Sequence, residues 1–475
     1  MKKKSCAVLV AAMVILTGCN ANPGTSQSSA GENSSSSANT SSEAPAQSSS
    51  ESPAQSSSEA PVQSSSGESS TSSSAKNPPE IVPETSDVQL LDIDKYVRYH
   101  DEWTEDFETM MFMGDSTSVL LGKNASKLYP ELAVKLHEDK DLVLNSFEEG
   151  VTYGCELALE ELENNPDDFN CYSNSYNELI RRADSVAVSI LSDNYNDATG
   201  FGPFKGFTAR NFDTETGKML QITDVIKDFS GIPEIIKTEL ESGIVGVEAY
   251  SAEEIADYFN NVYEDYLVWS IDYNGVTFYF DYGVIAPSDY GLLSVTVTFA
   301  EHPEIFVEKY MNVPENYIVN FPMYSIYSTD LTGDGDCEEL CVSYDGYQCE
   351  IYMTDSYFSD ELSALYAYPF YVKNDGKHYL YLFLDNSDEE YREMKLAVYG
   401  LNGGKIEKIG EPNVGMYYEP TGNKPDDLLS VPTDPNEFFL DDFDDETRNY
   451  SFDGIYDAGG PVAYKVDDTG MPVKK

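Results

Sequence analysis

The feature that most constrains this chain is a serine-rich segment, residues 20–76, that cannot fold by itself. It contains 24 serines, no aromatic residue and a single large aliphatic residue, Val62. An octapeptide of the form Glu-Ala-Pro-Ala-Gln-Ser-Ser-Ser occurs three times, with small changes, over residues 43–66. A segment this polar buries too little apolar surface to offset the entropy lost on ordering. The sequence therefore predicts a disordered tether, followed by a folded region that begins near residue 80.

An export signal precedes the tether. Three lysines at positions 2–4 are followed by the apolar run Ala7–Leu16, which is too short to span a bilayer as a helix. The run ends in Leu16-Thr-Gly-Cys19, which resembles the lipobox of bacterial lipoproteins. The resemblance implies that the signal peptide, residues 1–18, is removed and that Cys19 carries the lipid anchor at the start of the tether, residues 19–79. The protein would then project into the cell wall from the outer face of the cytoplasmic membrane. The alternative is an ordinary secretory signal that happens to contain a cysteine.

The predicted folded region is strongly acidic. The chain has 84 Asp and Glu residues against 29 Lys and Arg residues, a formal charge of −55, and all but five of the acidic residues lie beyond position 79. This charge argues against binding of nucleic acid, whose phosphates require a basic surface, and against adhesion of the protein surface to anionic lipid. It would attract cationic proteins, although solubility at a secreted surface also explains it.

Residues 80–318 show both helical and strand patterns, which predicts an α+β domain. Apolar residues at helical spacing follow Ile232-Pro233, and the capping box Ser251-Ala-Glu-Glu254 marks the start of another helix. Asn274-Gly275 is typical of a two-residue hairpin turn. The predicted elements are helices over residues 137–163 (in spite of Gly150 and Gly154), 232–240 and 251–263, strands over 269–273, 276–280 and 293–299, and a turn at 213–217.

Residues 319–412 predict a smaller, mostly antiparallel β domain. Its alternating runs cover residues 340–344, 350–354, 369–373, 379–384 and 396–401, with turns at Asp345-Gly346 and Asp375-Gly376. The remaining residues, 413–475, form an acidic C-terminal segment. Its phenylalanines could dock on the domain or stay loose; they are Phe438, Phe439, Phe443 and Phe452.

An acidic loop at the start of this β domain resembles the calcium loop of FG-GAP-like repeats. Oxygen-bearing side chains stand at alternate positions, which lets a loop wrap around one cation, and a glycine at the sixth position permits the sharp turn. The predicted ligands are Asp330, Thr332, Asp334, Asp336 and Glu338. The twelfth position is Cys341 and not the glutamate of an EF-hand, so we expect a weak site for millimolar extracellular calcium. The alternative is an acidic turn that binds no metal.

Five short stretches resemble, in order, the extracellular RsiV-type domain. They are Leu128–Leu132, Ile180–Ser185, Asn211–Lys218, Phe278–Pro287 and Val313–Glu315. The family includes the anti-sigma factor RsiV, whose outer domain binds host lysozyme, modules attached to peptidoglycan deacetylases, and many lipoproteins. Members commonly carry a Gly-Gly-Ala-His-Gly loop, whereas the corresponding residues here, Thr199–Pro203, contain no histidine. The sequence shows neither a transmembrane helix nor a sigma-binding segment, so we do not expect an anti-sigma role.

The cysteines and histidines show no metal-binding or catalytic spacing. Beyond Cys19 five cysteines remain, an odd number that leaves at least one free thiol or an intermolecular bond: Cys155, Cys171, Cys337, Cys341 and Cys349. Cys155 and Cys171 could close a short loop, whereas a two-residue turn at Asp345-Gly346 would place Cys341 and Cys349 on opposite faces of a hairpin. The isolated histidines favour structural or surface roles; they are His100, His137, His302 and His378.

No nucleophile elbow, zinc-protease motif or phosphate loop occurs in the sequence. We therefore expect a non-catalytic surface lipoprotein that binds or senses an extracellular protein or a cell-wall ligand. The alternatives are lysozyme binding of the RsiV type and an accessory role in cell-wall glycan modification.

Overall fold

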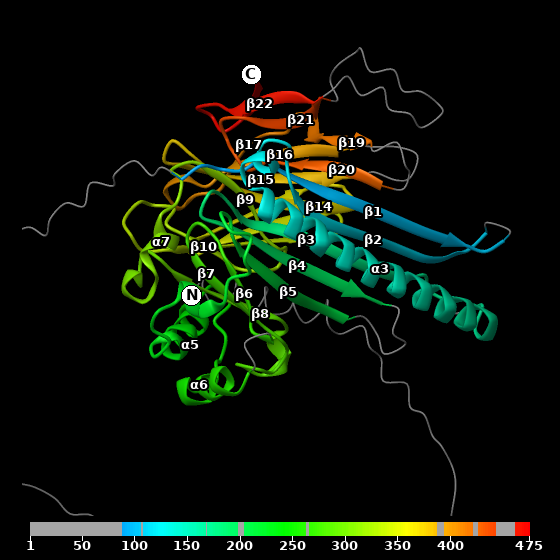
Figure 1. The fold of residues 1–475 in the computed structure, drawn as a ribbon, viewed down its shortest axis with the longest axis horizontal. Coiled ribbons are helices and arrows are strands. Elements are labelled where there is room, and N and C mark those ends of the chain that lie inside the picture. Colours follow the sequence, from blue (N-terminus) through cyan, green and yellow to red (C-terminus); the bar gives the residue numbers. More distant parts are fainter. Residues whose placement is uncertain are drawn as a thin grey trace, which may run out of the picture. The chain divides into compact units, whose positions relative to one another are not determined.

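A seven-stranded sheet pairs strands from the N-terminal and C-terminal parts of the described chain (Figure 1). This computed structural model describes residues 88–105, 108–167, 169–197, 204–262, 266–386, 394–420, 426–442 and 461–475. The predicted signal peptide, Cys19 and the tether lie outside these ranges. The strand order in the sheet is β19-β20-β1-β2-β3-β4-β5. The strands are β1 (Ile93–Trp103), β2 (Met110–Leu121), β3 (Tyr172–Ala183), β4 (Ala187–Asn196), β5 (Phe204–Asp213), β19 (Tyr418–Pro420) and β20 (Asp426–Val431).

The long helix α3 (Pro130–Asn164) connects β2 to β3, which pair in parallel, and it lies along one face of the sheet (Figure 1). The sequence predicts the helix from residue 137, but it begins seven residues earlier because Pro130 occupies the first turn, where a missing N–H costs nothing. Glycine suits position 150 because α3 lies close to the sheet at this point and leaves little room for a side chain. A Cβ atom at this position would lie 2.6 Å from the amide nitrogen of Asn174.

A three-stranded sheet and two helices form a separate core. The sheet contains β6 (Val268–Ile271), β7 (Gly275–Phe280) and β8 (Leu293–Thr298), and the helices are α5 (Ile232–Ser242) and α6 (Ala252–Asn261). Both helices confirm their sequence signals. Ile232, Ile236 and Leu240 are buried on one side of α5. Ser251 and Glu254 form the predicted capping box of α6.

The predicted hairpin at Asn274-Gly275 exists, but its register differs. A two-residue turn would pair Tyr273 with Val276, whereas the structure pairs Ile271 with Val276. The Asp272 carboxylate accepts hydrogen bonds from the N–H groups of Asn274 (2.8 Å) and Gly275 (3.1 Å), so the first strand ends before Asp272. Glycine is required at 275, since a Cβ atom would lie 2.2 Å from the carbonyl oxygen of Val297.

The remaining strands form three further sheets. Their orders are β10-β11-β12-β13, β17-β16-β15-β14-β9 and β18-β21-β22-β23. The strands are β9 (Tyr317–Asn320), β10 (Tyr327–Thr329), β11 (Glu338–Tyr344), β12 (Gln348–Met353), β13 (Ser356–Glu361), β14 (Tyr366–Asn374), β15 (Lys377–Asp385), β16 (Met394–Gly400), β17 (Glu407–Gly410), β18 (Val414–Met416), β21 (Phe438–Asp442), β22 (Val462–Val466) and β23 (Pro472–Lys474). The short helices are α2 (Ala125–Leu128), α4 (Ile222–Val225), α7 (Glu308–Met311), η2 (Ser288–Tyr290), η3 (Pro303–Ile305) and η4 (Asn402–Gly404).

Strands pair across both boundaries predicted within the folded region. β9 contains residues 318 and 319 and pairs with β14, and β20 from the C-terminal segment pairs with β1. Phe438 is buried in the largest core, whereas Phe443 and Phe452 lie outside the described residues. The described residues belong to one compact unit, 23% helical and 45% strand, which is broadly α+β. No helix among them is long and apolar enough to cross a membrane.

Two adjacent arginines at the end of β3 form a buried network of ion pairs and hydrogen bonds. Arg181 donates to the Asp272 carboxylate (2.6 Å) and to the carbonyl oxygen of Asn320 (2.8 Å). Arg182 donates to the Asp184 carboxylate (2.8 Å) and to carbonyl oxygens near α7. All four charged side chains are at most 1% exposed. Ile180–Ser185, one of the five stretches that resemble the RsiV-type domain, therefore joins the large sheet to the β6-β7-β8 region.

Candidate functional site

The predicted calcium loop connects β10 to β11. The pairing of these strands begins next to the loop, where Thr329 pairs with Glu338. Asp330 stabilises the turn itself, because its carboxylate oxygens accept the N–H groups of Gly333 (2.6 Å) and Gly335 (3.1 Å). Both glycines have positive φ angles, which side-chain-bearing residues rarely adopt. The loop thus has the sharp turn that its sequence predicts.

The loop does not gather its predicted ligands around one point. Thr332, Asp334 and Asp336 are exposed, and the Glu338 carboxylate accepts the N–H of Leu331 (2.8 Å). Among the described residues, no three of the loop carboxylates lie within 4.8 Å of one another. The donors are oxygens, the ligand type that calcium prefers, but an ion would have to draw the exposed carboxylates inward. Calcium binding therefore stays a prediction.

A second acidic group, which the sequence reasoning missed, lies beside this loop. Ligand atoms of Glu239, Glu301 and His302 lie within 4.8 Å of one another. Glu301 contacts the loop, because its carboxylate accepts the N–H of Cys337 (3.4 Å). Burial and the charge of Glu301 raise the pKa of Glu239. The three residues come from α5 and from the segment after β8, so no local spacing in the sequence marks them.

Glu239 also lines a small cavity of about 50 Å³ between α5, β8 and β11. Glu239 and Glu339 lie in its wall with Tyr290 and Tyr324. The Glu339 carboxylate accepts the N–H of Ile244, which fixes its position. A cavity of this size holds only water or a single small ion.

Behind the loop, a chain of buried hydrogen bonds reaches the core. Its members are polar side chains of the β6-β7 turn and of β9, β10, β14 and β15: Asn274, Tyr317, Tyr327, Thr329, Tyr371 and His378. At its end the Tyr371 hydroxyl lies 2.5 Å from Nδ1 of His378. Burial lowers the pKa of His378 to about 4, so this histidine is neutral at physiological pH. These contacts give His378 a role in holding the strands beneath the loop.

A third polar group lies on β1, β2 and β3. Lys95 is 5% exposed and lies near the carboxylates of Asp115 and Glu178. Burial lowers the pKa of Lys95 to about 8, in spite of these two charges, and raises the pKa of Asp115 to about 6. Glu178 also accepts the N–H of Val119 (2.7 Å) and pairs with Arg210.

The five described cysteines are free thiols. Cys155 packs on the α3 side of the sheet with Phe112 and Tyr172, whereas Cys171 lies near Asp101 and Met113, whose side chains point to the opposite face. The two therefore do not form the possible bridge. Cys341 and Cys349 also lie on opposite faces, as expected, although the turn between them has four residues and not two. Tyr344 pairs with Cys349.

The other two histidines differ in their surroundings. His137 is exposed on α3, with Nδ1 2.8 Å from the carbonyl oxygen of Ala133. His100 lies near Glu102 and Cys155, between β1 and α3. The loop at Thr199–Pro203, which lacks the histidine of the RsiV family, lies outside the described residues.

Comparison with known structures finds neighbours among solved proteins, of which two are described below. No protein-family model matches the sequence, and no curated protein matches it. A DUF3298-family protein from Bacteroides fragilis has 11% identity and a TM-score of 0.32, over 46% of this chain and 95% of its own. A DUF3298-family protein from Pseudomonas aeruginosa PAO1 has 14% identity and a TM-score of 0.30, over 48% of this chain and 98% of its own. The structural neighbours are thus DUF3298-family proteins.

Proposed function

We propose that this chain is a lipid-anchored surface protein that binds a cationic extracellular protein or cell-wall component without catalysis. The N-terminal signal and lipobox support the compartment, and the serine-rich tether would hold the folded region away from the membrane. The stretches that resemble the RsiV-type domain support a recognition role.

One observation carries the choice of a cationic partner. More than half of the basic side chains of the described residues form ion pairs with nearby acids. Twelve of them form ion pairs: Arg98, Lys135, Lys140, Arg181, Arg182, Lys205, Arg210, Lys237, Lys309, Lys408, Lys474 and Lys475. The remaining acidic excess includes the exposed Asp334, Asp336 and Glu301, and Glu301 contacts the loop that carries the other two. Such a surface increases the rate at which a cationic partner associates.

The test is retention of a basic protein by the immobilised full chain. Lysozyme is the probe, and this choice also tests the alternative of RsiV-type lysozyme binding. The matched control is lysozyme whose lysines have been succinylated, which removes their positive charge. We expect retention of the basic form only. Retention should be strong at about 10 mM salt, where the Debye length is ~30 Å, and lost at about 1 M, where it is ~3 Å. Equal retention of both forms, or of neither, contradicts a charge-selected partner.

The absence of catalysis is tested separately with purified peptidoglycan. We expect binding at most, with no soluble sugar and no acetate released over hours of incubation. Release of either product would favour the alternative role in wall glycan modification over the binding role.

Calcium binding at the 330–338 loop is a second proposal, supported by the oxygen donors and the turn at Asp330. We expect millimolar calcium to raise the melting temperature of the full chain, and chelator to reverse this. The double variant Asp334→Asn/Asp336→Asn should lose the increase. Asp345→Asn is the matched control, because Asp345 stabilises a similar turn by accepting the N–H groups of Tyr347 and Gln348. A melting temperature that chelator leaves unchanged contradicts the proposal.

Lipid attachment is tested by metabolic labelling with a radioactive fatty acid. We expect Cys19→Ala to remove the label and to release the protein from the membrane fraction. Cys6→Ala, which changes the other cysteine of the signal segment, should leave both unchanged. A Cys19→Ala protein that remains firmly membrane-bound would contradict the predicted anchor.

A further inference from the structure

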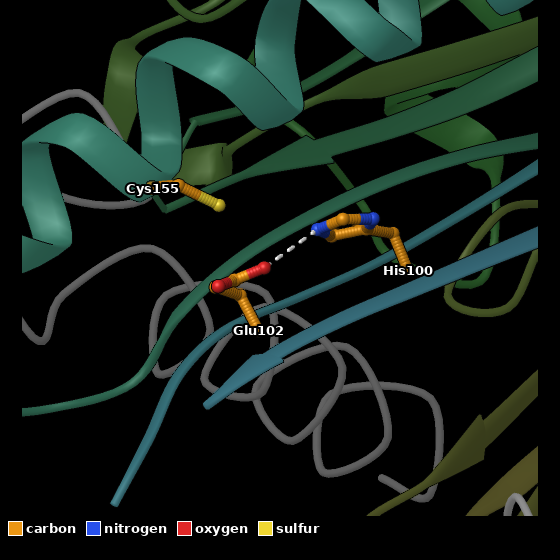
Figure 2. Close-up of side chains that lie close together, drawn as sticks. All are labelled: His100, Glu102 and Cys155. Atoms are coloured by element: carbon orange, nitrogen blue, oxygen red, sulfur yellow. Dashed lines mark ion pairs between the residues drawn. The ribbon is translucent and has the colours of Figure 1, made fainter. Parts of the chain in front are cut away.

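Three side chains with different metal-binding atoms converge between α3 and the end of β1 (Figure 2). His100 and Glu102 come from β1, and Cys155 comes from α3. One ligand atom of each residue lies within 4.8 Å of those of the other two. Nε2 of His100 and the nearer carboxylate oxygen of Glu102 are 3.6 Å apart.

The fold explains why these residues meet. His100 and Glu102 are two positions apart on a strand, so both side chains point to the same face of the sheet, the face that α3 covers. Cys155 is on the inner side of α3, next to the buried cluster of Phe112, Phe147 and Val151. Opposite His100 on β2 stands Gly114, which adds no side chain beside the imidazole. A β-bulge follows Glu102, a feature that often re-aims side chains at sites.

The polar atoms of the group are incompletely bonded in the protein alone. Nε2 of His100 is buried and has no hydrogen-bond partner, and at 3.6 Å the Glu102 oxygen is too distant to accept one. Burial and the charge of Glu102 raise the pKa of the Cys155 thiol to about 11. A cation between the three atoms would use the imidazole lone pair, offset the charge of Glu102 and stabilise the thiolate form of Cys155.

We propose that His100 Nε2, the Glu102 carboxylate and Cys155 Sγ bind one zinc ion. Sulfur, imidazole nitrogen and carboxylate oxygen are the three zinc ligand types in proteins, whereas calcium and magnesium require oxygen alone. Zinc bonds of ~2.0–2.3 Å at the tetrahedral angle place ligand atoms roughly 3.3–3.8 Å apart. The separation of His100 and Glu102 falls in this range. The Cys155 sulfur lies within 4.8 Å of the other two ligand atoms and would move closer to them when the ion binds.

The site is open on one side, which provides an entry path. The side chains of His100 and Glu102 are 34% and 46% exposed. With three protein ligands, a water molecule completes the fourth position from this side. Binding replaces the thiol proton: the S–H bond breaks, the thiolate sulfur bonds to zinc, and the proton passes to water. Affinity therefore rises with pH, and the ion links the C-terminal half of α3 to β1.

The experiment is a metal titration of the reduced full chain against a chromophoric zinc chelator. We expect one zinc ion per chain at a tight site, above weaker binding to surface carboxylates. Cobalt in the same site should give the near-ultraviolet charge-transfer band of a cobalt–thiolate bond. This band reports a metal–sulfur bond directly, which carboxylate binding cannot produce.

Variants identify the ligands. Cys155→Ala should abolish the cobalt–thiolate band, and His100→Gln should weaken zinc binding by more than the roughly 10–100-fold cost of losing a group that only supports a ligand. The matched controls are Cys171→Ala, a half-buried thiol near the other face of the sheet, and His302→Gln, a histidine beside two glutamates. Both controls should retain the band and the tight site.

Two results would overturn the proposal. One is a full chain without a cobalt–thiolate band when every thiol is reduced. The other is a tight site that survives Cys155→Ala or is lost in His302→Gln, which would move the metal to the Glu239 group. Melting curves of the metal-free variants separate loss of a ligand from loss of the fold, and none of these results depends on the proposed cationic partner.

Discussion

Two groups of buried charge meet β3 within a few residues of each other, and they differ in how completely they are bonded. At Arg181 and Arg182, each guanidinium faces a carboxylate and also donates to backbone carbonyls. At Lys95, a single ammonium lies near two carboxylates, and its pKa and that of Asp115 are displaced toward neutrality. Burial alone therefore does not decide whether a charged group mainly holds the fold together or titrates near neutral pH; the number of its bonding partners matters as well. In the first group two carboxylates and several backbone carbonyls hold the guanidinium groups, whereas in the second group burial moves the pKa of Lys95 to about 8 and that of Asp115 to about 6.

The largest effect is expected from removing one charge of the buried arginine group. Arg181→Met leaves the buried Asp272 carboxylate without its cation, and such a loss typically costs about 3–5 kcal/mol of unfolding free energy. The double variant Arg181→Met/Asp272→Asn should recover part of this loss, since no unpaired charge remains. Urea denaturation at pH 7 measures both. A single-variant loss below about 1 kcal/mol, typical of an exposed pair, would remove the distinction between the groups.

The second group should respond in the opposite direction. Lys95→Met removes a buried ammonium that is penalised in the fold, so we expect a gain of about 2–3 kcal/mol at pH 7. In the wild type, Lys95 has lost its proton in the folded state but keeps it in the unfolded state between pH 8 and 10.5. The unfolding free energy therefore rises with pH over this interval. The gain of the variant should therefore disappear above pH 10.5. Lys205→Met, which changes a half-exposed lysine, is the control; a variant gain that persists at high pH contradicts the assignment.

Asp115 should add a smaller dependence on the acid side. Its pKa in the fold, about 6, lies above the value of 3.8 for an unperturbed aspartate, so the fold binds more protons between these values. Wild-type stability should consequently fall as the pH rises from 4 to 6. Asp115→Asn should lose part of this slope and not all of it, because burial also raises the pKa of Asp94 to about 6. Melting temperatures of both proteins between pH 4 and pH 6 provide the measurement. Identical slopes for the two proteins would contradict the prediction.

The smallest effect sets the scale for the others. Lys237 and Glu241 form an exposed ion pair one turn apart on α5. Glu241→Gln should leave the unfolding free energy in urea denaturation almost unchanged, and high salt should remove any difference that remains. A loss of unfolding free energy as large as that of Arg181→Met would contradict this prediction. It would mean that an exposed ion pair stabilises the fold as much as the buried one.

The sequence predicted elements whose signals are local. The capping box at Ser251 and the apolar spacing from Ile232 each report on about ten neighbouring residues, and both helices form as expected. The hairpin at Asn274 has the wrong predicted register because the Asp272 side chain competes for the turn N–H groups. The pairing of β1 with β20 could not be predicted, since no local pattern specifies a partner that is distant in sequence.

The candidate metal groups show the same limit. A zinc motif is recognised when its ligands are closely spaced in one segment. His100 and Glu102 stand on a strand and Cys155 on a helix that follows much later, so each looks isolated in the sequence. Only the parallel pairing of β2 and β3, with α3 as the crossover, brings them together. The calcium loop, by contrast, has visible spacing but no convergence of its carboxylates in the fold.

The position of β1 between β2 and β20 also governs how this protein is made. The Thr433 hydroxyl donates to the carbonyl oxygen of Leu91, 342 positions earlier, so one edge of β1 stays unpaired until the C-terminal part of the chain folds onto it. Until then a row of backbone N–H and C=O groups is open to pairing with another chain. A C-terminal truncation before residue 426 would make this transient edge permanent.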